Sequence, residues 1–262
     1  MSLIGIIASS RLTISAPPVS GYYAWWDASD TTTISLSGSN VTQWDDKSGN
    51  GYNLTQSNDS LRPSSGTRTI NGLNVLDYSG YSDTLYSANA SSVWKFLHYN
   101  TYTIFCVNLI DSFQSGYNGW WMATRGGNYA AGPGILAMYK DSTNKLEHAV
   151  VGNNDANLSN ISTSTMSTAT TTCWTIVGDP QNATAANRSD IRKNTGSAEK
   201  NNTISNAAYN VNPAQTLRIG DYTDGGGSSI DGAMAEILIY DSILTAQQIT
   251  DTQNYLIDKW GI

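Results

Sequence analysis

The hydrophobic residues of this chain fall into short runs, some continuous and some alternating with polar residues, and each run ends at a cluster of Gly, Asn, Asp or Ser. Runs of this length with such boundaries are typical of β-strands. Long polar segments such as "SNDSLRPSSGTR" separate them. Ten strands at this spacing predict an all-β fold, a two-sheet antiparallel sandwich of the jelly-roll type. The expected strands are 22–27, 73–78, 101–110, 119–124, 134–139, 145–151, 172–178, 188–193, 215–220 and 230–240.

The hydrophobic residues follow a helical period rather than a strand-like one only at the C-terminal end, in "LTAQQITDTQNYLIDKWGI". Thr245 and Gln248 have the spacing of a helix capping box, and Gly261 suits the position just past a helix end. The apolar residues recur at helical spacing on one side, which predicts one amphipathic helix lying on the sandwich. That stripe is Ile249, Leu256, Ile257 and Trp260.

Composition narrows the list of partners. Charged residues make up 13 % of the chain and the net charge is −7, against about 25 % charged residues in a typical domain. There is no basic stripe with interleaved aromatic residues, so we expect no nucleic-acid partner. Cys106 and Cys173 both lie in apolar runs and are expected to pack as small hydrophobic residues, with a disulfide or a reactive thiol as the alternative.

Several segments in order resemble a known superfamily. They are "WDASDTTTISLSGSNVTQWDDKSGNGYNLTQ", then "RP" and "NGLNVLDY", then "TYTIFCVNLI", and finally "GAMAEILIYDSILTAQQITDTQNYLIDKWGI". Together they are similar to the concanavalin A-like lectin/glucanase superfamily in its laminin-G-like form, over about residues 22–262. The resemblance implies ligand sites on rim loops or on a concave sheet. It also implies that domains of this type are frequent appendages on phage tail fibres, head fibres and decoration proteins.

Catalytic residues of the superfamily have no counterpart in the sequence. Its hydrolase members carry paired glutamates on one strand, because glycosidic cleavage needs two carboxyl groups flanking the bond. The glutamates here are Glu147, Glu199 and Glu236, which are far apart in the chain. His98 and His148 have no metal-ligand or triad spacing and are expected on the surface or in loops. We therefore expect that the protein is not an enzyme.

Aromatic and amide residues gather in "GYNGWWMATRGGNY". Sugar recognition combines an aromatic face with polar groups that bind hydroxyls, so this stretch is the candidate glycan site. Successive residues of a strand face opposite sides, so one of its two tryptophans belongs to the core, and packing of both is the alternative. Trp25 and Trp26 are expected to pack in the same alternating way. The candidate site comprises Tyr117, Asn118, Trp120, Trp121, Arg125, Asn128 and Tyr129.

Oxygen ligands for a hard cation are abundant in "DYTDGGGSSIDG". Laminin-G-like domains often hold calcium at a sheet edge, so the resemblance implies a calcium site formed by Asp221, Asp224 and Asp231. The spacing is not that of an EF-hand, and a solvated turn is the alternative. No other cofactor is expected.

The chain opens with "MSLIGIIASSRLTIS", an apolar segment outside the resemblance. It lacks the basic residues and the length of a secretory signal, and no stretch has the ~20 apolar residues of a membrane span. We divide the chain into an arm, 1–20, and a sandwich domain, 21–262. The arm is expected to dock on neighbouring subunits or on a particle surface, with an extra strand on its own sandwich as the alternative. Its docking residues are Leu3, Ile4, Ile6 and Ile7.

These observations predict a non-enzymatic phage virion protein, a head decoration, head-fibre or tail-fibre component that displays a lectin-like domain. Its expected partners are other virion proteins, bound through the arm, and a host surface glycan. By analogy with fibre and decoration proteins it is expected to be a homotrimer at the virion surface. The alternatives are a secreted or cell-surface carbohydrate-binding module, with an extracellular location, and a divergent glycoside hydrolase.

Overall fold

Antiparallel strands make up nearly all of the regular structure. The computed structural model describes residues 16–113, 119–125, 132–140, 143–151, 158–200, 210–223 and 226–262. Within these ranges the chain forms sixteen strands and two α-helices, and the paired strands run antiparallel. The predicted all-β class is therefore confirmed. Residues 1–15 of the N-terminal arm, with Leu3, Ile4, Ile6 and Ile7, lie outside the described residues.

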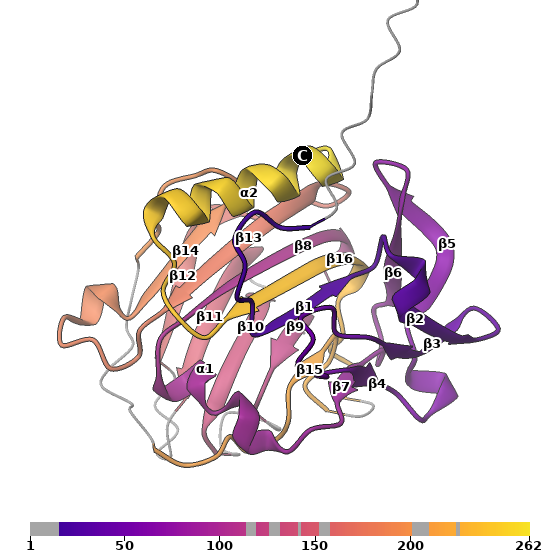
Figure 1. Cartoon of the computed structure of the whole chain (residues 1–262), viewed down its shortest axis with the longest axis horizontal. Helices are drawn as coiled ribbons and strands as arrows, with labels where there is room; N and C mark the ends of the chain where they lie inside the picture. Colours follow the sequence, from indigo (N-terminus) through magenta and orange to yellow (C-terminus); the bar gives the residue numbers. More distant parts are fainter. Residues whose placement is uncertain are drawn as a thin grey trace, which may run out of the picture.

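The elements follow one another along the chain as shown in Figure 1. The helices are α1 (Phe96–Tyr99) and α2 (Ala246–Trp260). The strands are β1 (Ala24–Asp27), β2 (Ile34–Ser37), β3 (Asn40–Trp44), β4 (Leu54–Thr55), β5 (Ser64–Ile70), β6 (Leu73–Ser79), β7 (Leu85–Ser87), β8 (Tyr102–Ser112), β9 (Gly119–Ala123), β10 (Gly134–Lys140), β11 (Lys145–Val151), β12 (Leu158–Thr165), β13 (Thr171–Gly178), β14 (Ser189–Lys193), β15 (Arg218–Ile219) and β16 (Asp231–Tyr240).

The strands form one continuous hydrogen-bonded path rather than two separate sheets. Its order is β12-β11-β10-β9-β15-β7-β4-β3-β5-β6-β16-β8-β13-β14, with β1 beside β16 and β2 beside β3. In Figure 1 the sheet curls so that β9 to β12 lie behind β16, β8 and β13, and the two ends of the path, β12 and β14, contact each other. The predicted jelly roll of two sheets is corrected in this respect, because short strands such as β15, β7 and β4 connect the two halves.

Each of the ten predicted strands overlaps an observed strand, whereas β2, β3, β4, β5, β7 and β12 were not predicted. The missed strands are short or mainly polar: β5 reads "SSGTRTI" and β12 reads "LSNISTST". Such segments carry no hydrophobic period, and they become strands because neighbouring strands offer them hydrogen-bonding partners.

Both faces of the central strands β8, β13 and β16 are buried. On β8, Ile104 and Cys106 point into the main core between the two halves of the sheet, whereas Phe105 points to a second cluster on the outer face. This accounts for the continuous apolar runs in the sequence, since a strand covered on both sides has no solvent-facing residues. Cys106 and Cys173 are free and fully buried, so the prediction that they pack as small hydrophobic residues is confirmed.

The tryptophans of β1 follow the same alternation. Trp26 belongs to the main core, where its Nε1 donates to the carbonyl oxygen of Tyr52 at 3.2 Å. Trp25 belongs to the outer cluster. The prediction that this pair packs on opposite faces of the first strand is confirmed.

Helix α2 covers the outer face, as Figure 1 shows. The backbone N–H of Gln248 donates to Thr245 Oγ1 at 3.3 Å and the Thr245 N–H donates to Gln248 Oε1 at 2.9 Å, which completes the predicted capping box. Gly261 has φ 70°, a left-handed conformation that glycine adopts readily. The predicted C-terminal helix is therefore confirmed. Among the described residues no helix has the length and hydrophobicity needed to cross a membrane.

Both histidines are fully buried, so their expected surface or loop positions are wrong. The ring of His148 on β11 contacts Tyr102 OH through Nε2 at 2.8 Å and Ser189 Oγ through Nδ1 at 2.9 Å. Nδ2 of Asn160 on β12 also donates to Ser189 Oγ, at 3.2 Å. These bonds tie β11 and β12 to β14 where the curled sheet closes on itself, and burial without a compensating charge lowers the pKa of His148 to about 3.

This lowered pKa predicts acid sensitivity. The unfolded chain takes up a proton at His148 near pH 6.5 and the folded protein only near pH 3, so between these values the unfolded state binds more protons. The contribution of His148 to the free energy of unfolding should therefore decrease by about 1.4 kcal/mol per pH unit as the pH falls below about 6.5. Denaturant titrations at pH 7.5, 6 and 5 should show this slope, and His148→Gln should make it shallower. An unchanged slope in the variant would show that other groups set the acid response.

Candidate functional site

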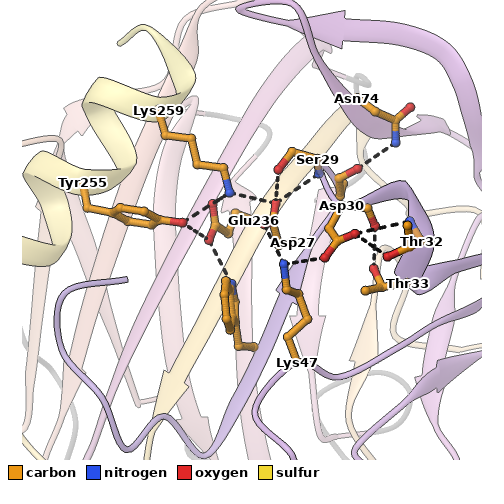
Figure 2. Close-up of polar contacts among 12 residues, drawn as sticks. Asp27, Ser29, Asp30, Thr32, Thr33, Lys47, Asn74, Glu236, Tyr255 and Lys259 are labelled. Carbon is orange, nitrogen blue, oxygen red and sulfur yellow. Dashed lines mark hydrogen bonds and ion pairs between the residues drawn. The ribbon is translucent and has the colours of Figure 1, made fainter. Parts of the chain in front are cut away.

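A group of five interacting charged side chains lies between β1, β16 and α2, and Figure 2 shows it in detail. Glu236 on β16 is fully buried. Its Oε1 accepts bonds from Trp25 Nε1 at 2.9 Å and Tyr255 OH at 3.0 Å, and its Oε2 accepts from Lys259 Nζ at 2.7 Å and Trp260 Nε1 at 2.9 Å. Each carboxylate oxygen therefore has two donors.

The charges alternate outward from this carboxylate. Lys259 Nζ lies 2.7 Å from Glu236 Oε2 and 2.8 Å from Asp27 Oδ1. Lys47 Nζ then joins Asp27 Oδ2 at 3.2 Å to Asp30 Oδ2 at 2.8 Å near the surface. Lys47 also lies 4.4 Å from the centre of the Trp25 ring. The cluster thereby connects β1, the segment after β3, β16 and the last turn of α2.

The two buried carboxylates of this cluster have pKa values shifted in opposite directions. Burial, with the neighbouring charge of Asp27, raises the pKa of Glu236. Burial acts in the same direction on Asp27, but Lys259, Ser29 and Lys47 outweigh it and the pKa of Asp27 is lowered. Opposed shifts of this kind occur at acid–base sites. Here the donors already occupy both oxygens of Glu236, so this carboxylate holds helix α2 on the sheet.

The predicted glycan stretch is only partly described. Trp121 on β9 is fully buried in the main core and cannot stack on a ligand. Arg125 is also buried, and its Nε donates to the carbonyl oxygen of Gly132 at 3.2 Å. The backbone of Trp120 lies in β9. The side chain of Trp120 and the remaining predicted residues lie outside the described residues, so the site in this stretch stays a prediction; they are Tyr117, Asn118, Asn128 and Tyr129.

The predicted calcium ligands are likewise only partly described. Asp221 is buried and its Oδ1 accepts from the backbone N–H of Tyr222 at 2.6 Å. The carboxylate of Asp231 accepts a hydrogen bond from the hydroxyl of Ser112. Asp224 lies outside the described residues. No group of three or more His, Cys, Asp or Glu side chains in the described part of the chain is arranged to hold a metal ion. The calcium site stays a prediction.

A solvent-open depression lies at one end of the central strands, lined by residues from three loops. Its volume is about 350 Å³ and its lining is Tyr99, Asn100, Thr101, Asp179, Gln181 and Asp241. The strand register explains how these residues meet. Tyr102 pairs with Gly178 and Thr103 pairs with Tyr240, so the start of β8 lies beside the ends of β13 and β16.

Local contacts hold the three loops together. A Cβ atom at Gly178 would lie 2.1 Å from the Tyr102 ring, so glycine is required for the end of β13 to approach the start of β8. Gln181 Nε2 donates to the carbonyl oxygen of Tyr99 at 2.7 Å. Thr103 Oγ1 donates to the carbonyl oxygen of Ser242 at 2.9 Å and thereby positions the segment that carries Asp241.

The lining supplies the groups that sugar recognition uses. Tyr99 offers a partly buried aromatic ring, with Lys95 Nζ 5.4 Å from the ring centre. Asp179 Oδ2 accepts from Asn182 Nδ2 at 2.7 Å, and Asp241 is exposed. An aromatic face beside carboxylate and amide groups matches the apolar face and polar edge of a pyranose or furanose ring.

The sequence analysis missed this site because its residues are spread over the chain from 99 to 241. Each of them lies within three residues of an end of a strand that was predicted: 101–110, 172–178 or 230–240. The pairing order of those strands was the missing information, because it decides which loops share an end of the sheet.

Comparison with known proteins identifies the fold. No protein-family model and no curated protein matches the sequence. Solved structures do match. Domain 4 of AbnA, a GH43 extracellular arabinanase from Geobacillus stearothermophilus, in complex with arabinotriose, has a TM-score of 0.61 at 11 % identity, covering 88 % of this chain and 98 % of that one. A Trypanosoma rangeli sialidase in complex with sialic acid has a TM-score of 0.60 at 13 % identity and covers 93 % of this chain. The binding domain of botulinum neurotoxin serotype D has a TM-score of 0.59 at 14 % identity.

The coverage differs among these neighbours. This chain spans 34 % of the sialidase chain and 51 % of the neurotoxin binding domain, but nearly all of the arabinanase domain. At these identities the likeness shows a shared fold.

The prediction that the protein is not an enzyme is corrected by these neighbours. It depended on the absence of the paired-glutamate motif of one class of hydrolase. The same fold occurs in the chain of a sialidase and in a domain of an arabinanase, both of which are enzymes. Absence of that motif therefore does not exclude an enzyme.

The charge cluster at Glu236 leads to a stability prediction. Lys259→Met leaves the fully buried Glu236 without its cation, so it should reduce the free energy of unfolding by about 3–5 kcal/mol. Asp258→Asn changes a neighbouring exposed residue of the same helix and should change that free energy by about 0.5 kcal/mol or less. Urea unfolding measures both.

A double variant, Glu236→Gln/Lys259→Met, removes both partners of the closest ion pair. It should lose less stability than the sum of its two single variants, because no isolated charge is left at Glu236. If Lys259→Met were as stable as the parent protein, the cluster would not be what holds α2 in place.

Proposed function

We propose that this protein is a carbohydrate-binding domain with a lectin-like fold of the concanavalin A-like superfamily. One observation carries the proposal: the chain matches, over nearly the whole length of both, a solved arabinanase domain in complex with arabinotriose. The sequence resemblance to the laminin-G-like form of that superfamily supports the same assignment.

The depression formed by the three loops is the proposed binding site. Its volume of about 350 Å³ lies at the lower end of the range for small-molecule sites, which suits one or two sugar units. The loops are at the end of rigid, doubly buried strands, which is where sandwich-type folds commonly place their binding residues. In Figure 1 α1 and the start of α2 lie on this side of the molecule.

The carbohydrate-binding assignment favours the alternative of a secreted or cell-surface module over the narrower virion assignment. A phage head or tail location, a homotrimer and docking through residues 1–20 stay predictions from the sequence. The neighbours are an arabinanase domain, a sialidase and a toxin binding domain. The arabinanase domain and the sialidase, whose structures hold arabinotriose and sialic acid, support sugar recognition. Catalysis is tested separately by reducing-sugar release from the same oligosaccharides.

The binding proposal predicts that arabinotriose, xylotriose, cellotriose or lactose binds to the full chain in calorimetric titrations. Tyr99→Ala should weaken the affinity about tenfold, because it removes the aromatic face that stacks on the sugar. Tyr99→Phe keeps that face and should retain most of the affinity.

Tyr81 provides the matched control, since its side chain is 77 % exposed and does not line the depression. Tyr81→Ala should bind like the parent protein. Absence of binding to every sugar, neutral or acidic, would refute the proposed function. Binding that survives Tyr99→Ala unchanged, in a variant that remains folded by circular dichroism, would refute the proposed site.

A further inference from the structure

The charge of the depression bears on the class of sugar that fits it. Two of its six lining residues, Asp179 and Asp241, carry carboxylates, and none of the six carries a cationic side chain. Outside the lining, the ammonium group of Lys95 lies beside Tyr99, with Nζ 5.4 Å from the centre of the Tyr99 ring. The whole chain adds a net charge of −7. Among the lining side chains, a ligand therefore meets two negative charges and no positive one.

The two carboxylates differ in how firmly they are held. Asp179 follows β13 directly; its backbone N–H donates to the carbonyl oxygen of Arg188 at 2.9 Å and its Oδ2 accepts from Asn182 Nδ2 at 2.7 Å. Arg188 is buried, and its Nε donates to the carbonyl oxygen of Asn182 at 2.8 Å, beneath this loop. Asp241 is exposed at the end of β16. These hydrogen bonds hold the Asp179 carboxylate in place at the depression.

Carboxylates accept hydrogen bonds from sugar hydroxyls, and side-chain amides both accept and donate them. A hydroxyl group can donate to Asp179, Asp241 or the amide oxygens of Asn100 and Gln181, whereas a sugar carboxylate can only accept. An acidic sugar would place a like charge beside two carboxylates and gain fewer donors in return. Like charges brought together at a binding interface oppose association.

We infer that the depression selects uncharged sugars and discriminates against sugars that carry a carboxylate, such as sialic and uronic acids. This inference depends on the proposed carbohydrate-binding function and adds the chemical class of its ligand. The inferred ligand class differs from that of the sialidase neighbour, whose structure holds sialic acid. It agrees with that of the arabinanase domain, whose structure holds a neutral trisaccharide.

The test compares matched neutral and acidic probes. Lactose is compared with 3′-sialyllactose, which carries one additional acidic residue. Galactose is compared with galacturonic acid, which carries one acidic group. The full chain should bind the neutral member of each pair about tenfold more tightly at low salt, as expected when the sugar carboxylate lies roughly 6 Å in water from each of the two Asp carboxylates. The ratio should decrease at 0.5 M salt, because salt screens these charges.

The variant Asp179→Asn/Asp241→Asn removes both charges and keeps an oxygen acceptor at each position. Its neutral-to-acidic affinity ratio should fall to about two or less, even if both affinities decrease together. The control Asp59→Asn/Asp258→Asn makes the same change in net charge at exposed residues that do not line the depression, and it should keep the parent ratio.

The outcomes separate the two proposals. If no sugar of either class binds, the carbohydrate-binding function fails. If sugars bind but the acidic members bind as tightly as the neutral ones, the function stands and the inferred selectivity is wrong. The selectivity is also wrong if it persists unchanged in Asp179→Asn/Asp241→Asn, because the charges would then not be its source.

Discussion

The packing of α2 depends on how the charge of Glu236 is neutralised. This carboxylate lies on β16 with no exposed surface, in a place where an isolated charge would be unstable. Four donors from β1 and α2 surround it, and Lys259 connects it to Asp27. The contacts in Figure 2 therefore fix the position of α2 as well as stabilise it, because the donors on the helix must all reach the same carboxylate.

With α2 in that position, the three central strands are buried on both faces. Their outer residues pack under the helix and their inner residues pack against the strands of the other half of the sheet. Such strands have little freedom to shift register, since a shift by one residue would exchange the two faces. The loops at their ends are held correspondingly well, and the depression lined by Tyr99, Asp179 and Asp241 is built on this rigid base.

The same architecture serves different proteins, so the chemistry of individual residues has to decide function. The neighbours include a domain with bound arabinotriose, a sialidase with sialic acid and a toxin binding domain. Glu236 shows that a buried carboxylate with a perturbed pKa can have a structural role. Its raised pKa has the direction seen in catalytic acids, yet its oxygens are occupied by the side chains that anchor α2.

The sequence by itself determined the local elements whose signals are periodic or terminal. The strands rich in apolar residues, the alternation of Trp25 and Trp26, and the helix cap at Thr245 and Gln248 were all predicted, because side-chain period and capping chemistry act over a few residues. The polar strands β5 and β12, the burial of His148 and the continuous path of the sheet depended on partners far away in the chain. The candidate site belongs to this second group. Tyr99, Asp179 and Asp241 each follow or precede a strand that was predicted, and only the long-range pairing of β8 with β13 and β16 brings them to one end of the sheet.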